Sequence, residues 1–120
     1  MKKTKNAFLF AIQGLRHAFV HERNFKIEIV LAIAACIAGY ALHISNLEWL
    51  IVIMNIGFVL SAELVNTAIE KLCDVTTNEI NPLIKIIKDV AAAAVLLAAV
   101  TAFVCASIIF IPAFLKIIHQ

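Results

Sequence analysis

The sequence has few charged residues and few cysteines. Charged residues make up 15% of its 120 residues and the formal net charge is +2, so there is no strongly basic surface for nucleic acid. Cys36, Cys73 and Cys105 each stand alone in an apolar segment, which indicates neither a disulfide framework nor a zinc site. Polar and charged residues interrupt residues 6–23, so a signal peptide is not indicated and we expect this segment to be retained.

Apolar residues dominate instead. They form 63% of the chain, and the mean hydropathy is +1.00, which is too apolar for a soluble domain of this size. Three apolar runs, at about 29–47, 49–70 and 90–115, are each long enough to cross a hydrocarbon core of about 30 Å as a helix. The sequence therefore predicts an all-α membrane protein with three transmembrane helices in one membrane domain, residues 1–120.

The basic residues predict the orientation. Nine of the ten fall before the first run or between the second and the third: Lys2, Lys3, Lys5, Arg16, Arg23, Lys26, Lys71, Lys85 and Lys88. Positive charge accumulates on the cytoplasmic side, so we expect the N-terminus and the second loop to be cytoplasmic. Within 6–23, Phe8, Ile12, Leu15 and Phe19 share one helical face, which predicts an amphipathic helix at the membrane interface.

Polar residues interrupt the second run on one side. Glu63, Asn66 and Glu70 follow at spacings of three and four, and Thr67 and Asp74 lie on the same helical face. An ionisable side chain inside a membrane costs about 2.5–3.5 kcal/mol on insertion scales. A chain that keeps several of them on one stripe is expected to use them.

Depth in the membrane suggests what this stripe does. With Trp49 at the outer boundary, Glu63 lies in the cytoplasmic part of the core and Glu70 at the inner interface. That range suits a reaction between a lipid and a water-soluble substrate. Glu63, poorly solvated, suits a general base, and Glu70 with Glu22 offers oxygen ligands for Mg²⁺. Lys88 can pair with phosphate as a point charge.

Two segments carry a family resemblance. AELVNTAIEKLCD at 62–74, followed by KDVAAAAVLLA at 88–98, resembles the signature of the prokaryotic diacylglycerol kinase family. The resemblance implies a homotrimer of three-span subunits with an interfacial N-terminal helix, in the bacterial inner (plasma) membrane. It also implies interfacial active sites that draw on neighbouring subunits and that use ATP and Mg²⁺. The family has no P-loop, and none is present here.

The implied activity is transfer of the ATP γ-phosphate to the hydroxyl of a membrane lipid alcohol. Diacylglycerol, which would give phosphatidic acid, is the first expectation. Undecaprenol is the alternative, because the stretches at 22–24 and 48–51 resemble the Gram-positive branch. A different class of function also stays open: a non-enzymatic membrane subunit in which the acidic stripe joins helices or forms an ion path.

The resemblance assigns roles to single residues. Glu63 matches the catalytic base, Asn66 the amide beside it, and Glu22 and Glu70 the two metal-linked carboxylates. Four further positions match nucleotide-contacting residues: Glu79, Asn81, Lys88 and Asp89. The chain departs from the Gram-negative pattern at Asn6, Phe10, Asn81 and Ala92, which bear on contacts to adenine and lipid.

Overall fold

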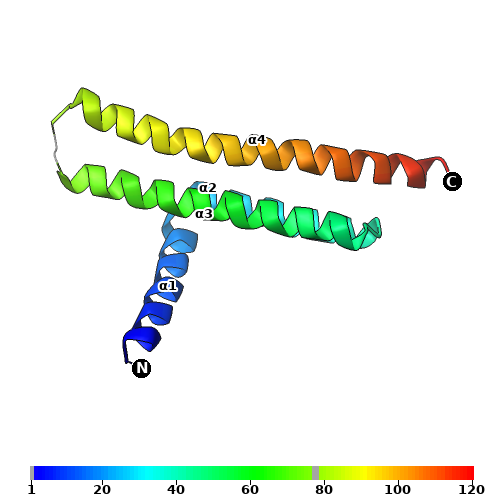
Figure 1. The fold of residues 1–120 in the computed structure, drawn as a ribbon, viewed down its shortest axis with the longest axis horizontal. Helices are drawn as coiled ribbons and strands as arrows, with labels where there is room; N and C mark the ends of the chain where they lie inside the picture. The colour runs from blue at the N-terminus through cyan, green and yellow to red at the C-terminus, as the bar shows by residue number, and fades with distance from the viewer. Residues whose placement is uncertain (1, 77–78) are drawn as a thin grey trace.

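The computed structural model describes residues 2–76 and 79–120, and these residues form helices joined by short turns, with no strand among them. The helices are α1 (Lys2–His21), α2 (Arg23–Ala41), α3 (Asn46–Thr76) and α4 (Pro82–Ile118). Helices α2, α3 and α4 lie side by side as an antiparallel bundle (Figure 1). Helix α1 projects away from this bundle, starting near the middle of the bundle's long axis. The prediction of an all-α protein is confirmed.

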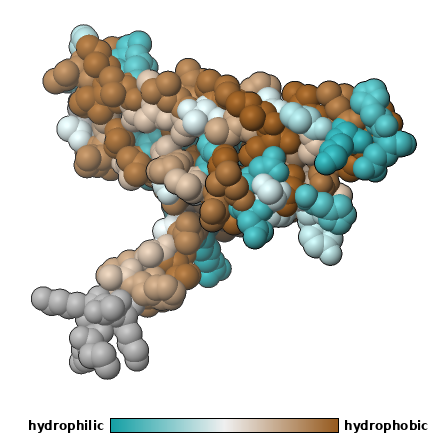
Figure 2. Space-filling model, turned by 45° about the vertical axis from the view of Figure 1, so that its right-hand side comes forward, coloured by the Kyte–Doolittle hydropathy of each residue, from teal (hydrophilic) through white to brown (hydrophobic). Residues whose placement is uncertain are grey.

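Three helices are long and apolar enough to cross a membrane, namely α2, α3 and α4. Little of each span is buried inside the single chain: 11%, 22% and 6% of the most apolar windows of α2, α3 and α4. Apolar side chains instead cover much of the outside, as the brown surface of Figure 2 shows. Hydrophobic surface on this scale requires lipid or another chain around it, so the chain is a multi-pass membrane protein.

The first hairpin has a short turn. Helix α2 ends at Ala41, six residues before the end expected for the first apolar run at about 47, and His43 has a positive φ of 52° in the turn. Helix α3 begins at Asn46 because Ser45 and Glu48 form a capping box. The Ser45 N–H donates to Glu48 Oε1 (2.9 Å), and the Glu48 N–H donates to Ser45 Oγ (3.2 Å).

The second connection is shorter than the gap between the second and third apolar runs. Helix α3 continues to Thr76, past the expected end at about 70, and α4 already begins at Pro82, before the expected start at about 90. Asn81 is the N-cap of α4, and its side chain accepts a hydrogen bond from the Leu83 N–H (2.9 Å). Proline in the first helical turn needs no hydrogen-bond partner and favours this start.

Close packing fixes the hairpin end of the bundle, where α2 meets α3. Ile44, Val52 and Ile109 form its buried apolar cluster, with Trp49 packed against them. Gly39 allows this contact, since a Cβ at this position would lie 2.9 Å from atoms of both Ile44 and Trp49. The hairpin end is thus apolar and tightly packed. The buried polar residues of α3 lie toward the other end of the bundle.

Ser45→Ala should destabilise the hairpin. Loss of the side-chain acceptor leaves the Glu48 N–H without its cap, which typically costs about 1 kcal/mol. Thermal unfolding in detergent, followed by circular dichroism, measures the change. Ser61→Ala, at an exposed position of the same helix, is the matched control and should leave the midpoint unchanged. Equal midpoints for both variants would show that the box contributes nothing.

Candidate active site

The buried polar side chains of the described residues gather on one stretch of α3. Glu63 is 4% exposed, and Asn66 and Thr67 are each 8% exposed. They occupy the half of α3 remote from Trp49, where α2 and α4 flank the helix (Figure 1). The surface of the chain is mostly apolar, so these polar side chains lie inside the bundle and apolar side chains lie outside it.

Glu28 of α2 joins this stretch, and the sequence analysis missed it. Its carboxyl group is close enough to that of Glu63 for a hydrogen bond between them. Two carboxyl groups, one from each of two helices, therefore lie close together in the interior of the chain. Glu28 directly precedes Ile29, where the first span was expected to begin. Its position inside the membrane was therefore not predicted.

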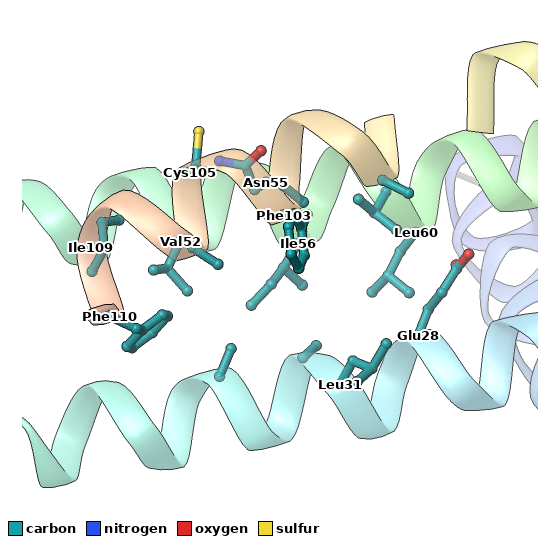
Figure 3. Close-up of a pocket in the computed structure, with 16 residues that line it drawn as sticks. Glu28, Leu31, Val52, Asn55, Ile56, Leu60, Phe103, Cys105, Ile109 and Phe110 are labelled. Carbon is teal, nitrogen blue, oxygen red and sulfur yellow. The ribbon is translucent and has the colours of Figure 1, made fainter. Parts of the chain in front are cut away.

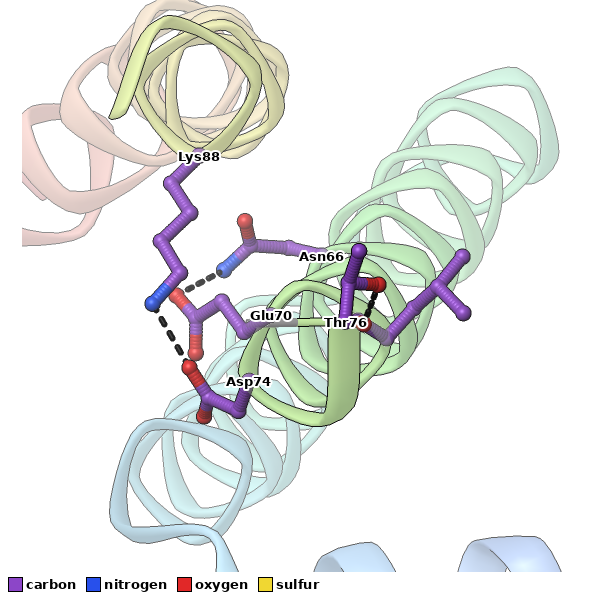
Figure 4. Close-up of polar contacts among 6 residues, drawn as sticks. Asn66, Glu70, Asp74, Thr76 and Lys88 are labelled. Carbon is purple, nitrogen blue, oxygen red and sulfur yellow. Dashed lines mark hydrogen bonds and ion pairs between the residues drawn. The ribbon is translucent and has the colours of Figure 1, made fainter. Parts of the chain in front are cut away.

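Two acceptor atoms here have no donor in the described part of the chain. They are Glu28 Oε2 and Asn66 Oδ1, both buried. The other atom of the Asn66 amide is engaged, because Nδ2 donates to Glu70 Oε1 (3.1 Å), as Figure 4 shows. A buried acceptor without a donor costs free energy. These two atoms are therefore suited to accept a hydrogen bond from a hydroxyl group of a bound molecule.

Helix α4 contributes a cation to the end of the stripe that lies nearest the connection between α3 and α4. Lys88 Nζ lies 2.7 Å from Asp74 Oδ1, and its charge also acts on Glu70 (Figure 4). The structure therefore brings Lys88 to the predicted site. It does not bring Asp89 there, since that carboxylate pairs with Lys85 at 2.7 Å on the exposed side of α4. Glu79 and Asn81 are also exposed.

Glu22 lies where α1 meets α2. Its Oε1 is 3.7 Å from Nζ of Lys71 on α3 of the same chain. Glu22 and Glu70 are both close enough to Glu63 for their charges to act on it. The predicted catalytic and metal-linked acids thus come together in one chain, and no neighbouring chain is needed for Glu22 to reach α3.

The acids fit an open magnesium site better than a closed one. No group of three His, Cys, Asp or Glu side chains within residues 2–76 and 79–120 is placed to hold a metal ion. Mg²⁺ is usually bound by one or two carboxylates, with waters and substrate phosphates completing the shell. Glu22 and Glu70, whose charges both act on Glu63, offer carboxylate oxygens of the kind that Mg²⁺ binds in such a shell.

An apolar cavity of about 360 Å³ lies beside the acids, between α2, α3 and α4. Glu28 stands at one end of it, and Phe110 and Ile109 lie toward the other (Figure 3). Asn55 is a further polar residue of the lining, and its Nδ2 donates to the Ile51 carbonyl (2.9 Å). The cavity therefore offers a hydrocarbon-lined space that ends at a carboxyl group.

Comparison with known proteins gives consistent matches. The family model described as prokaryotic diacylglycerol kinase matches residues 9–110. An undecaprenol kinase of Bacillus subtilis is 39% identical over 106 residues, which cover 88% of this chain and 86% of the relative. A diacylglycerol kinase of Synechocystis is 34% identical over 112 residues (92% and 64%). A diacylglycerol kinase of Escherichia coli is 30% identical over 95 residues (79% and 78%).

Proposed function

The chain belongs to the prokaryotic diacylglycerol kinase family and is an ATP-dependent lipid kinase, and we propose that it phosphorylates the hydroxyl of a membrane lipid alcohol at the buried face of α3. The observation that carries this proposal is the pair of buried acceptors without donors, Glu28 Oε2 and Asn66 Oδ1, of which Glu28 also lines one end of the apolar cavity. A lipid whose tail lies in the cavity would present its hydroxyl toward Glu28.

Glu63 acts as the general base in this proposal. The lipid hydroxyl oxygen forms a bond to the γ-phosphorus of ATP, the bond from that phosphorus to the ADP oxygen breaks, and Glu63 accepts the hydroxyl proton. Asn66 orients the hydroxyl beside it. The buried position of Glu63, 4% exposed, keeps water from competing for the same proton acceptor.

The nucleotide approaches from the cytoplasmic end. Glu22 and Glu70 would hold Mg²⁺, which neutralises phosphate charge when it is bound. Lys88 would leave Asp74 for a phosphate oxygen, since its side chain is 39% exposed and free to turn. Glu79, Asn81 and Asp89 lie further out along the connection and the start of α4, where the rest of the nucleotide would extend; these roles follow the family resemblance.

Two lipid alcohols are candidates. Diacylglycerol is favoured by the description of the family and by the names of the Synechocystis and Escherichia coli relatives. Undecaprenol is favoured by the 39% identity to the Bacillus subtilis undecaprenol kinase, the highest identity among the three relatives compared. The almost entirely hydrocarbon lining of the cavity does not distinguish between the two kinds of tail.

Placement and assembly form part of the same proposal. We place α1 on the cytoplasmic interface of a bacterial plasma membrane, with the N-terminus in the cytoplasm. Helix α4 leaves small side chains exposed at Ala92, Ala93, Ala94 and Ala99, and small residues allow close helix contact. This supports a homotrimer, which sedimentation in density-matched detergent would measure.

Lipid phosphorylation in mixed micelles tests the function. Purified protein with labelled ATP and Mg²⁺ should transfer label to diacylglycerol, to undecaprenol or to both, and the ratio of the two rates assigns the acceptor. A Glu63→Gln preparation controls for contaminating kinases. Absence of labelled lipid with both acceptors, from protein that retains its helical content, would contradict the proposal and favour a non-enzymatic membrane subunit.

A further inference from the structure

Glu22 lies at the junction of α1 and α2. It is the N-cap of α2, with an extended backbone (φ −105°, ψ 111°), and its side chain caps none of the free N–H groups there. The Glu22 side chain, 24% exposed, lies instead beside Lys71 of α3. The carboxylate is therefore directed by an ion pair rather than by its own helix.

Lys71 lies beside one of the two proposed metal ligands. Its ammonium is 3.7 Å from Glu22 Oε1. Lys88, the other cation near the stripe, is engaged with Asp74 at 2.7 Å. The Lys71 side chain is 56% exposed, so its ammonium can move into water without a large desolvation cost.

We propose that Lys71 is a positioning residue of the metal site, whose ammonium neutralises Glu22 and holds it against α3 until a divalent cation displaces it. The inference rests on the proposed function, because Glu22 has to bind the ion that accompanies ATP. An ammonium and a divalent ion at one carboxylate repel each other. Lys71 thereby weakens the binding of a free divalent cation to Glu22. A cation that is already bound to phosphate oxygens of the nucleotide gains further contacts and can displace the ammonium.

Binding of Mn²⁺, used as a spectroscopic substitute for Mg²⁺, tests this inference without turnover. Free Mn²⁺ is measured by electron paramagnetic resonance in a nonionic detergent without nucleotide. Lys71→Met should bind Mn²⁺ about three- to fivefold more tightly than wild type, as expected for loss of one partly exposed ion pair. Lys71→Arg keeps the charge and should bind as wild type does.

Two controls separate displacement at Glu22 from a general effect of charge. Lys85→Met removes the same charge from a lysine that pairs with Asp89, and should leave the Mn²⁺ affinity unchanged. In a Glu22→Gln background, Lys71→Met should no longer tighten Mn²⁺ binding, because the carboxylate for which the ammonium and the Mn²⁺ ion compete is absent.

Each other outcome overturns the inference. These outcomes are an unchanged affinity in Lys71→Met, an equal gain in Lys85→Met, a gain that persists with Glu22→Gln, and binding too weak to measure in both wild type and Lys71→Met. Lipid phosphorylation by the same wild-type preparation keeps the two proposals apart. If the wild type labels lipid, only the role of Lys71 fails; if it labels neither lipid, the proposed function fails whatever Mn²⁺ does.

Discussion

Glu63→Gln should bind ATP as the wild type does and transfer almost no phosphate to lipid. The buried Glu63 carboxyl lies beside Glu28 and within reach of the charges on Glu22 and Glu70. Glutamine keeps the size of the side chain but cannot accept the proton of a lipid hydroxyl. A positioned base contributes roughly 10²–10⁴-fold to the rate, so a loss of that order is expected in kcat.

The measurement compares lipid phosphorylation with nucleotide binding in one preparation. Glu48→Gln is the matched control, because it makes the same exchange on the same helix at the hairpin end, and glutamine also serves in a capping box. Its turnover should equal that of the wild type. Wild-type turnover in a folded Glu63→Gln protein would remove Glu63 from the mechanism.

Glu22→Ala and Glu70→Ala should each weaken binding of the Mg²⁺–nucleotide complex strongly. Loss of an outer-shell partner of a metal costs about 10–100-fold in affinity, and loss of a direct ligand should cost no less. If both carboxylates hold one ion, the double variant loses much less than the product of the two single losses, because groups that share a partner are not independent.

A titration of nucleotide in the presence of Mg²⁺ supplies the three dissociation constants. Asp89→Ala provides a comparison, since that carboxylate pairs with Lys85 on the exposed side of α4 and should combine independently with either single variant. Strictly multiplicative losses for Glu22 and Glu70 would show that the two acids never bind the same ion.

The sequence predicted those features that depend on composition and on spacing along one helix. The spans follow from the length of the apolar runs, and the shared stripe of Glu63, Asn66 and Glu70 follows from helical geometry. The structure confirms that Glu63 and Asn66 are buried. Their catalytic roles, and the roles of the nucleotide-contacting positions, stay predictions.

Features that depend on contact between helices were not predictable in the same way. Glu28 meets Glu63 only because α2 and α3 pack together, and Lys71 meets Glu22 only because the junction of α1 and α2 lies against α3. Spacing within one helix carries no information about such pairs. Apolar content also overestimates the length of the first span, because it continues to about residue 47 whereas the capping box of Ser45 and Glu48 already starts α3 at Asn46.

The cavity between α2, α3 and α4 has a consequence for how the enzyme meets its substrate. Its lining is apolar and belongs to the helices that are long enough to cross the bilayer, so in the proposed function a lipid would enter sideways and its product would leave the same way. Collisions then occur in two dimensions. The quantity that sets the rate is the mole fraction of the lipid alcohol among membrane lipids, so dilution with inert lipid slows the reaction even when the total amount of substrate is constant.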